Sequence, residues 1–354
     1  MVHAILYSIP LPNITFDKEN ITMKTTHILL TALLLSLGAH AADKPTLTVY
    51  TYDSFAADWG PAPKVKAAFE KANDCTVEFV PSSSAIGSLR KIQLEGKETK
   101  ADVLLGLDTS TANMAKTTGL FAKHTVDTSR LSLPTQWSDD TFVPYDYAYF
   151  AFVYDSNKTA KIPASLEELA STPKDFKIVI EDPRSSTPGL GLLLWVKAVY
   201  GDKAADYWKR LAPHILTITK GWSEAYNLFL KGEADMVLSY TTSPAYHMIA
   251  EKKFQYKTAN FAAGHYGQIE VAAALKSSRH PKLAQKFLDF ITTETFADII
   301  PTTNWTYPVV KTAKGLPAGF DKLYVPSKML LMEGKTVQAN RKAWIDEWLK
   351  AMAK

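Results

Sequence analysis

Aromatic, hydroxyl and acidic residues gather in the turns that follow the predicted strands of this sequence. Tyr52 ends a first predicted strand, Trp59 lies a short way beyond it, and Asp108 follows a third strand. The faces of Tyr and Trp attract cations and stack on flat rings. A carboxylate such as Asp108 could neutralise a positive centre, although an ordinary turn or cap would also place it there. These residue types favour a flat, positively charged ligand.

Later loops carry side chains of the same kinds, close to predicted strands and helices. They contain Ser186 and Thr187 before one helix, Trp222 before another, Tyr240, Thr241, Thr242, Ser243 and Tyr246 after a strand, and Trp305 in an open loop. Hydroxyls and backbone N–H groups at a helix start can bind an anion, although simple N-capping would use the same residues. An aromatic cage beside such a helix start fits a flat cationic molecule with a hydroxyl or phosphate tail.

No catalytic or metal-binding motif accompanies these residues. The eight His residues are scattered without His-x-x-x-His spacing and have no Cys partner, so a zinc site is not expected. Gly-x-Ser-x-Gly, Walker and EF-hand patterns do not occur, and the segment 189–192 (GLGL) does not make a dinucleotide fingerprint. The sequence therefore predicts a binding protein, with no metal ion and no cofactor, rather than an enzyme.

Alternating strands and helices make up the first part of the chain. Strands are predicted over 47–52, 75–80 and 102–107, with helices over 61–71 and 84–94 between them. A strand–helix–strand–helix–strand order implies right-handed crossovers and a parallel sheet. The lone cysteine, Cys75, is expected to be a small residue of the second strand.

A second αβ set follows an aromatic segment, 142–155, that is typical of a long strand. It comprises helices over 165–170, 189–200, 204–212 and 223–231, strands over 177–180, 215–219 and 235–240, a further extended segment over 268–275, and closing helices over 281–292 and 341–352. Two αβ lobes joined by two extended segments predict a bilobal α/β protein with a ligand cleft at the carboxyl ends of the strands. Hinge strands of this kind let lobes close.

Length and composition agree with two lobes. We expect residues 42–142 and 268–310 to form lobe 1, residues 143–267 to form lobe 2, and residues 311–354 to form a C-terminal helical segment. A chain of 354 residues with 46% hydrophobic and 21% charged residues is neither disordered nor polytopic in a membrane. Because 40 basic residues face 36 acidic ones, the net charge of +4 gives little reason to expect a nucleic-acid partner.

The N-terminus predicts export. Met23 and Lys24 precede a mostly apolar core of ten residues, 28–37, and a small-x-small site at 39–41. This is the pattern of a secretory signal, and its apolar core is too short to span a bilayer. Cleavage after Ala41 would leave a mature chain beginning at Ala42. The preceding residues 1–22 place acidic residues ahead of the signal, so we expect Met23 to be the true start.

Four blocks of sequence resemble the periplasmic thiamine-binding proteins of thiamine ABC transporters. They are LTVYTYDSFAADWG at 47–60, DPRSSTPGLGLLLW at 182–195, KGWSEAY at 220–226 and LSYTTSPAYH at 238–247. The resemblance runs from about Leu47 to the last helix. It implies a type 2 periplasmic-binding-protein fold, commonly monomeric, that binds thiamine, thiamine monophosphate and thiamine diphosphate. It further implies an inner-membrane permease with its ATPase as partner, in a Gram-negative periplasm.

The resemblance also carries site residues onto this chain. By motif, Ser186 and Thr187 serve the oxygen-rich tail of the ligand and Trp222 lines the site. The loop Tyr240–Ser243 and the aromatic residues Tyr246, Tyr52, Trp59 and Trp305 also match the cleft. One segment departs from the family, because this chain has Ser84 and Ala85 where the family has an acidic residue and then a glycine. Backbone or hydroxyl contacts must replace any contact from that carboxylate.

Two other functions are possible for such a sequence. A ferric-iron receptor of similar fold would use tyrosinate oxygens, often from adjacent tyrosines, whereas Tyr240 and Tyr246 are separated. A thiamine-degrading enzyme of similar fold, thiaminase I, uses a Cys nucleophile with an acidic base, whereas Cys75 stands at the start of a predicted strand. Because ligands bind at the carboxyl ends of strands, this position argues against the enzyme.

Overall fold

The computed structural model describes residues 44–353. The predicted signal segment, the cleavage site after Ala41 and the alternative start at Met23 lie outside the described residues. Within the described part, no helix is both long enough and apolar enough to cross a membrane.

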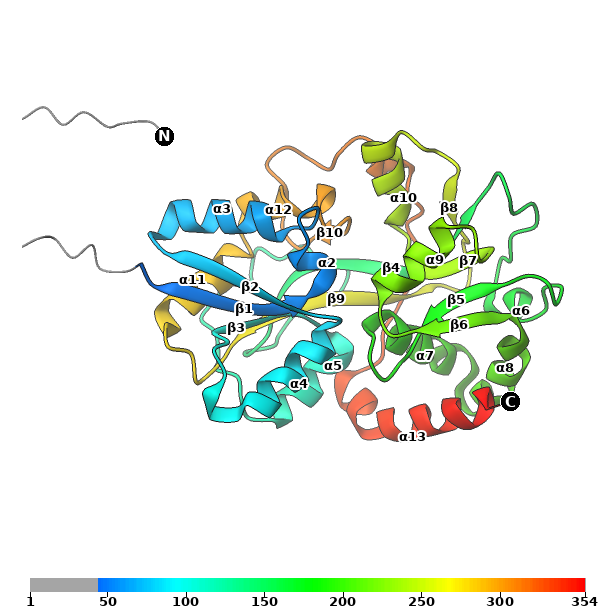
Figure 1. Cartoon of the computed structure of the whole chain (residues 1–354), viewed down its shortest axis with the longest axis horizontal. Coiled ribbons are helices and arrows are strands. Elements are labelled where there is room, and N and C mark those ends of the chain that lie inside the picture. Colours follow the sequence, from blue (N-terminus) through cyan, green and yellow to red (C-terminus); the bar gives the residue numbers. More distant parts are fainter. Residues whose placement is uncertain (1–43, 354) are drawn as a thin grey trace, which may run out of the picture. The chain divides into compact units, whose positions relative to one another are not determined.

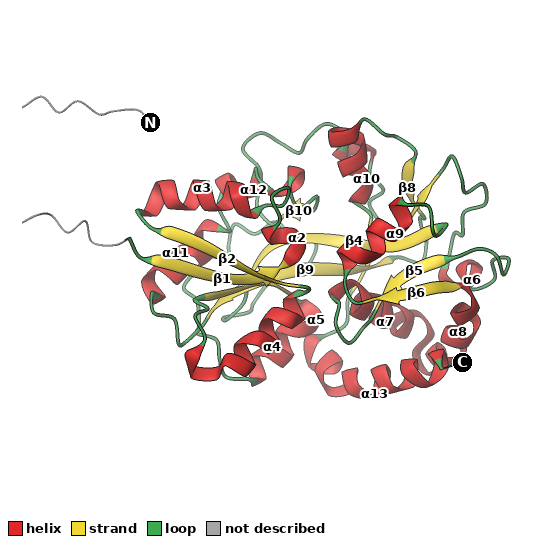
Figure 2. Cartoon of the chain, viewed as in Figure 1, coloured by secondary structure: helices red, strands yellow, loops and turns green. Residues whose placement is uncertain are grey.

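Strands from the whole described length join in one sheet. They are β1 (Thr46–Tyr52), β2 (Thr76–Ser82), β3 (Val103–Asp108), β4 (Val143–Asp155), β5 (Ile178–Glu181), β6 (Ile215–Thr219), β7 (Met236–Tyr240), β8 (Tyr256–Thr258), β9 (His265–Ala274), β10 (Tyr307–Pro308) and β11 (Met329–Leu330). The order along the sheet is β2-β1-β3-β9-β4-β7-β5-β6, with β8 and β10 paired to β4 and β11 paired to β9. The yellow arrows of Figure 2 show this sheet running through the length of the folded unit.

Helices pack on both faces of the sheet (Figure 1). They are α2 (Asp53–Ala56), α3 (Ala62–Asn73), α4 (Ala85–Glu95), α5 (Thr109–Thr117), α6 (Leu166–Leu169), α7 (Thr187–Tyr200), α8 (Ala204–Leu211), α9 (Trp222–Leu230), α10 (Ser243–Tyr246), α11 (Pro281–Phe290), α12 (Glu294–Ala297) and α13 (Gly334–Met352). Short 3₁₀ turns are η1 (Gly96–Glu98), η2 (Gly201–Lys203), η3 (Ala212–His214), η5 (Ile300–Thr302) and η6 (Phe320–Lys322), and η4 (His247–Glu251) is a π-helical turn.

Each end of the sheet is a parallel three-stranded set, as the strand–helix alternation predicts. Strand β1 lies between the parallel strands β2 and β3, and β5 lies between the parallel strands β6 and β7. Lobe 1 is here the β1 set with α2–α5, α11 and α12, and lobe 2 is the β5 set with α6–α10. The prediction of a parallel first set is confirmed, and the second αβ set is parallel as well.

Two long strands connect the lobes. Strand β4 pairs antiparallel with β9 along Val143–Tyr149 and then with β7 along Phe150–Tyr154. Strand β9 lies between β3 and β4, and it pairs antiparallel with β3 of lobe 1 along Glu270–Ala274 and with β4 along Gly267–Ala272. Because β4 belongs to both halves of the sheet, the two lobes share a backbone through it (Figure 1).

Lobe 1 buries its sheet on both faces. Along β3, Val103 and Leu105 point into a core with α3 and α11, and Leu104 and Leu107 point into a core with α4 and α5. Strands covered on both sides read as nearly continuous apolar runs. This explains why the apolar run at residues 102–107 predicts a strand from the sequence.

Helix α13 reaches across both lobes and is longer than the sequence predicted. It begins at Gly334 rather than near residue 341, and it packs on α5 of lobe 1 and on α7 and α8 of lobe 2. Asn113 of α5 donates a hydrogen bond to Gln338 at 2.7 Å, and Lys197 of α7 pairs with Glu347 at 3.3 Å. The polar first turns of α13 give no apolar periodicity, so only the later, amphipathic part was predicted.

Four helices and the short strands β8, β10 and β11 were not predicted from the sequence, and the boundary of β2 differs. Helix α5 (TSTANMAKT) is rich in residues of low helix propensity, and α2, α10 and α12 are single turns, so none gave a periodic signal. Cys75 lies just before β2 instead of within it, and its side chain is buried among the core residues of lobe 1.

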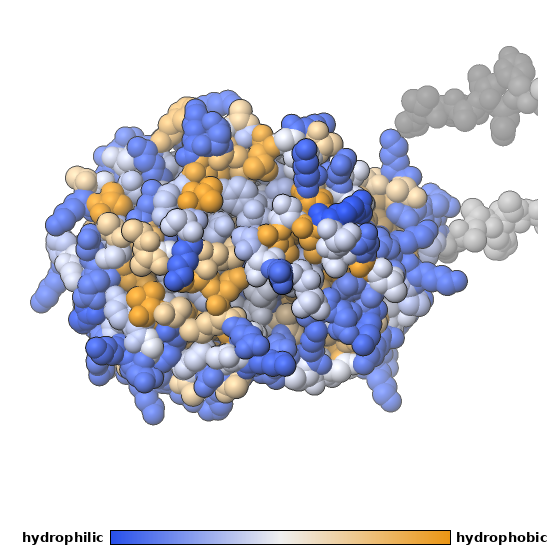
Figure 3. All heavy atoms as spheres, turned by 180° about the vertical axis from the view of Figure 1, so that it is seen from behind, coloured by the Kyte–Doolittle hydropathy of each residue, from blue (hydrophilic) through white to orange (hydrophobic). Residues whose placement is uncertain are grey.

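Large exposed apolar side chains come from separate elements. Trp59 is 58% exposed, Phe254 60% and Leu94 88%. Seen from behind, orange apolar residues lie in small groups between blue polar ones (Figure 3).

Helix α7 is buried on all sides along most of its length, and its glycine at position 191 makes this possible. A Cβ atom at Gly191 would overlap the ring of Phe150 on β4. We therefore expect Gly191→Ala to lower the free energy of unfolding by about 1–3 kcal/mol, although alanine is ordinarily the better helix former by about 1 kcal/mol. Denaturant unfolding measures the difference.

The same substitution in a Phe150→Leu background is the control. The smaller side chain leaves room for the new methyl group, so the cost of Gly191→Ala should shrink in that background. If the Gly191→Ala protein were as stable as the unmodified chain, the contact between α7 and β4 would have room for a methyl group.

Candidate functional site

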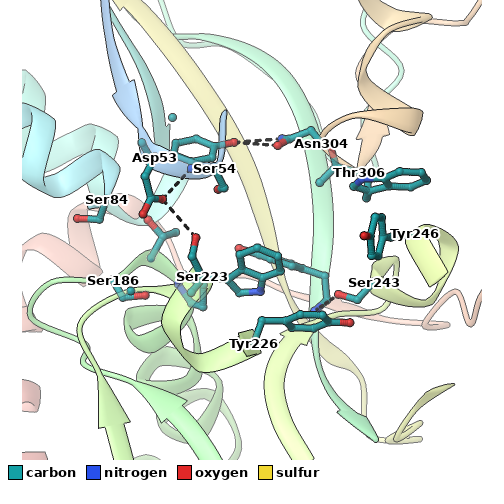
Figure 4. A pocket seen from close by; sticks show the side chains of 18 of the residues that line it. Asp53, Ser54, Ser84, Ser186, Ser223, Tyr226, Ser243, Tyr246, Asn304 and Thr306 are labelled. Carbon is teal, nitrogen blue, oxygen red and sulfur yellow. Dashed lines mark hydrogen bonds between the residues drawn. The ribbon is translucent and has the colours of Figure 1, made fainter. Parts of the chain in front are cut away.

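A cavity of about 550 Å³ opens between the two lobes. The structure brings to its wall all but three of the residues expected from the sequence, namely Tyr52, Trp59, Ser84, Ala85, Ser186, Thr187, Trp222, Tyr240, Ser243, Tyr246 and Trp305. Most of them follow the carboxyl ends of β1, β2, β5, β6 and β7 or lie in the helices after these strands, whereas Trp305 lies in the loop between η5 and β10. Figure 4 shows Ser84 and Asp53 on the lobe 1 side of this cavity and Ser186 and Ser223 on the lobe 2 side.

Asp108, Thr241 and Thr242 do not line the cavity. Asp108 stands at the N-cap position of α5, and its carboxylate accepts a hydrogen bond from Thr111 at 2.7 Å. It therefore caps the helix, which is the alternative role that the sequence allowed. Thr241 and Thr242 are fully buried in the turn after β7, where the Thr241 N–H donates to the carbonyl of Tyr149 at 2.8 Å. Both hydroxyls are buried inside the fold and have no hydrogen-bond partner among the described residues.

Two stacked rings form the lobe 2 wall. Trp222 and Tyr226 lie with ring centroids 4.9 Å apart and an interplanar angle of 25°. The Trp222 indole N–H donates to Ser239 at 2.8 Å, and Ser239 in turn lies 2.7 Å from the hydroxyl of Ser243. These bonds fix the face that Trp222 can present to a ligand.

A chain of hydrogen bonds through His247 holds the ring of Tyr226 in place. The Tyr226 hydroxyl lies 2.9 Å from Nε2 of His247, whose Nδ1 lies 2.6 Å from the Glu251 carboxylate. Burial lowers the pKa of His247 and raises the pKa of Tyr226. At neutral pH the imidazole is therefore neutral, donates through Nδ1 to Glu251, and accepts from Tyr226.

A second aromatic pair lines the cavity from the other side. Trp305 meets Tyr246 edge to face, with centroids 5.4 Å apart and an interplanar angle of 76°. Trp305 has a φ of 59°, in the left-handed region that bulky side chains rarely adopt. Backbone strain of this kind concentrates at ligand sites, where it holds a side chain in a required direction.

Three helix N-termini converge on the cavity. Residues at the starts of α4, α7 and α9 line it, and Ser84 and Ser186 cap the first two by accepting from Gly87 and Gly189. Gly221 stands at the N-cap position of α9 and offers no side-chain cap. Exposed N–H groups and the helix dipole make such ends favourable for an anion. The cavity can thus accept negative charge although none of its described lining residues is Lys, Arg or His.

The lobes touch at the rim of the cavity. Ser223 of α9 donates to Asp53 of lobe 1 at 3.5 Å, as a dashed line in Figure 4 marks. Arg90 of α4 donates to the backbone carbonyl of Arg184 in lobe 2 at 3.1 Å. A Cβ atom on Gly221 would lie 3.0 Å from the carbonyl oxygen of Ser83, so the two loops approach closely there.

Acidic and amide groups lie where the hinge strands pass the cavity. The Tyr52 hydroxyl donates to Glu270 of β9 at 2.9 Å, and Asn304 donates to Asp146 of β4 at 2.6 Å. Gly106 allows this arrangement, since it has a φ of 109° and a side chain there would overlap the Tyr52 ring. Burial and the neighbouring Asp146 carboxylate raise the pKa of Glu270 well above its usual value.

Sequence reasoning missed several residues of this wall. Glu270, Gln268, Tyr226, Asp53 and Asn304 all line the cavity. Asp53, Tyr226 and Asn304 stand inside motifs that the sequence singled out, next to residues that were chosen. Glu270 is the only charged residue of its strand (HYGQIEVAAA), which is the signal that could have found it.

The described residues of the cavity offer neither a metal centre nor a reactive thiol. Among the described residues, no group of three or more His, Cys, Asp or Glu side chains is placed to hold a metal ion. Cys75 packs in the lobe 1 core with α3 and α11 and does not line the cavity, and burial raises the pKa of its thiol.

Comparisons with known proteins agree with this fold and cavity. Residues 52–297 match the family model of bacterial extracellular solute-binding proteins. The chain therefore belongs to the family of bacterial extracellular solute-binding proteins. It is similar to the thiamine-binding periplasmic protein of Escherichia coli, with 53% identity over 91% of this chain and 98% of that protein.

Other relatives extend the comparison. The thiamine-binding periplasmic protein of Haemophilus influenzae is 42% identical over 92% of this chain and 98% of its own. A solved periplasmic thiamin binding protein superposes with a TM-score of 0.86 at 53% identity, covering 90% of this chain and 98% of that one. The resemblance seen in the sequence is confirmed, and so is the type 2 periplasmic-binding-protein fold.

More distant structures share the fold alone. The ferric binding protein of Campylobacter jejuni superposes with a TM-score of 0.73 at 18% identity, over 86% of this chain and 99% of its own. The names of the nearer relatives and the family place this chain in the periplasm, as the predicted signal implies.

A buried carboxylate behind the cavity predicts a pH-dependent stability. Glu181, the last residue of β5, is 1% exposed, and both its carboxylate oxygens have no hydrogen-bond partner among the described residues. Burial raises its pKa. The folded state therefore holds a proton more tightly than the unfolded state, and stability falls as pH rises above about 4.3, the usual pKa of Glu.

Glu181→Gln removes this dependence. We expect the stability of the variant, relative to the unmodified chain, to rise by on the order of 1–3 kcal/mol between about pH 5 and pH 8. Denaturant unfolding at both pH values measures it, and Glu233→Gln on the exposed surface should change nothing. If the difference in unfolding free energy between the variant and the unmodified chain were the same at both pH values, a buried charge at Glu181 would be contradicted.

Proposed function

We propose that this chain is a periplasmic receptor that captures thiamine, thiamine monophosphate and thiamine diphosphate and delivers them to an ABC permease with its ATPase. The names of its nearer relatives support thiamine as the ligand. The observation that carries the proposal is the cavity itself, which combines two aromatic pairs, a carboxyl group and three helix N-termini.

Each part of thiamine finds a matching group in the cavity. The thiazolium ring carries a permanent positive charge, which aromatic faces attract by about 0.5–1 kcal/mol per contact and by ~2 kcal/mol when desolvated. Stacking of the flat pyrimidine adds to this. Submicromolar binding requires more than about 8 kcal/mol, which three or four such contacts and the stacking could supply. The phosphate groups would lie at the helix N-termini near Ser84, Ser186 and Gly221.

Hinge closure is part of the proposal. Strands β4 and β9 link the lobes, and the rim contacts Asp53–Ser223 and Arg90–Arg184 would form as the lobes close over a ligand. We propose the lobe boundaries 42–142 with 268–310 and 143–267, and a monomeric receptor in which α13 spans both lobes. The permease would then bind the closed, ligand-loaded form of the receptor.

The proposed receptor is not an enzyme. A thiaminase-like reaction needs a Cys nucleophile at the ligand, whereas Cys75 lies in the lobe 1 core. A ferric receptor needs free tyrosinate oxygens, whereas the Tyr240 hydroxyl donates to Gln268 at 3.0 Å and burial raises its pKa. Titration of tryptophan fluorescence tests these alternatives. We expect saturable quenching by thiamine, and colour on adding ferric iron without such quenching would contradict the proposal.

Removal of the stacked indole should weaken binding. We expect Trp222→Ala to lower thiamine affinity by more than ~1 kcal/mol, because the ring is half-buried, stacked and held at the cavity wall. Calorimetric titration measures the change. Trp344→Ala on α13, a half-buried indole that does not line the cavity, is the control. Equal affinities for the two variants would remove Trp222 from the site.

The start of α7 should distinguish the phosphate esters from thiamine. Replacing both Ser186 and Thr187 by alanine removes two hydroxyls at a helix N-terminus. We expect both esters to lose affinity by at least about threefold more than thiamine does, since only the esters carry an anionic tail. Ser165→Ala, which uncaps α6 away from the cavity, is the control. Equal losses for all three ligands would contradict a phosphate position at α7.

A further inference from the structure

Two carboxyl groups face each other across the hinge strands. Asp146 of β4 and Glu270 of β9 are register partners in the antiparallel pair, and they are 0% and 5% exposed. One Asp146 oxygen, Oδ2, accepts from Asn304 at 2.6 Å and from Thr306 at 2.7 Å. The other, Oδ1, has no donor among the described residues apart from a proton on Glu270.

The surroundings of the pair favour one shared proton. Two buried carboxylates in contact cannot both ionise, so one keeps its proton and donates it to the other. Asp146 has donors from Asn304 and Thr306, whereas Glu270 accepts from Tyr52 and weakly from Asn304 at 3.2 Å. The better-solvated carboxylate is therefore Asp146, and Glu270 bears the proton. The pair then carries a single negative charge.

This charge has no basic partner at the cavity. The groups that face the pair are the hydroxyls of Tyr52 on β1, Tyr145 on β4 and, further off, Tyr240 on β7, and burial raises the pKa of each of them. None of the described residues lining the cavity is Lys, Arg or His, and the other acidic side chain, Asp53, is exposed at the rim. A cation entering the cavity would thus lie near one uncompensated charge, which is itself buried behind the cavity wall.

We propose that the Asp146–Glu270 pair, sharing one proton, supplies the negative charge by which the site selects a cationic ligand over a neutral molecule of the same shape. The inference rests on the proposed function, and it assigns the charge selection to the hinge strands instead of to the aromatic walls. The proton stays on Glu270 when the ligand binds, so one negative charge meets the one permanent positive charge of thiazolium.

Thiamine and deazathiamine are the two probes. Deazathiamine is the neutral isostere in which carbon replaces the positively charged ring nitrogen, and its pyrimidine is unchanged. Calorimetric titration gives the ratio of the two dissociation constants. At about pH 7.5 the unmodified protein should bind thiamine at least about tenfold more tightly than deazathiamine. Failure to bind either probe would contradict the proposed function, whereas equal affinities would contradict only the charge selection.

Two variants separate the charge from the shape of the pair. Glu270→Gln keeps a hydrogen-bond donor toward Asp146 and should retain the preference for thiamine within about threefold. The double variant Asp146→Asn with Glu270→Gln has no charge, and its preference should fall to about onefold to twofold. A double variant with the full preference, or a Glu270→Gln protein that loses it, would overturn the proposal. Asp175→Asn with Glu233→Gln, both exposed, controls for net charge.

The unmodified protein provides a test that needs no variant. The pKa of Asp146 is raised to about 6 by burial, so a second proton neutralises the pair below that pH. The preference for thiamine should therefore be constant above about pH 7 and shrink as pH falls through 6. The same fall should persist in Asp53→Asn, which removes the other acid of the wall. A preference that is constant down to about pH 5, or one whose fall depends on Asp53, would overturn the proposal.

Discussion

The antiparallel pairing of β4 with β9 is the interaction on which the rest of the structure depends. Strand β4 leaves β9 at Tyr149 and joins β7 at Phe150, so one continuous strand belongs to both lobes. The carboxyl ends of the parallel strands on either side of this pair therefore point toward the same region between the lobes. A cavity forms there because loops follow the carboxyl ends of strands from two directions.

The same pairing brings together the side chains that give the cavity its chemistry. The register that opposes Asp146 to Glu270 also turns Gln268 toward Tyr240. The aromatic pairs come from α9, α10 and the loop that holds Trp305. In lobe 2, buried contacts fix the first pair, because Ser239 holds Trp222 and His247 holds Tyr226. A movement of the lobes would thus change the distance between the two aromatic pairs, while the hinge strands keep Asp146 and Glu270 in place.

Much of this architecture could be predicted from the sequence because its signals are local. Buried parallel strands are apolar runs, and the loops after them carry Tyr, Trp and Ser in recognisable motifs. The remaining features depend on contacts between distant residues. Asp108 looked like a ligand because a cap and a binding carboxylate occupy the same kind of position. Glu270 was missed because a single charged residue in an apolar strand does not show which side chain it will face, and only the register places it opposite Asp146. Helix α5 was missed because it is fixed by packing on α13 and not by propensity.

The central claim is that thiamine lies between the two aromatic walls. A crystal structure of the protein grown with thiamine tests it most directly. We predict electron density for one thiamine molecule in the cavity, with its thiazolium ring within about 6 Å of an aromatic face such as Trp222 or Trp305. Density for thiamine elsewhere on the protein, or an empty cavity in crystals grown with saturating thiamine, would contradict the account.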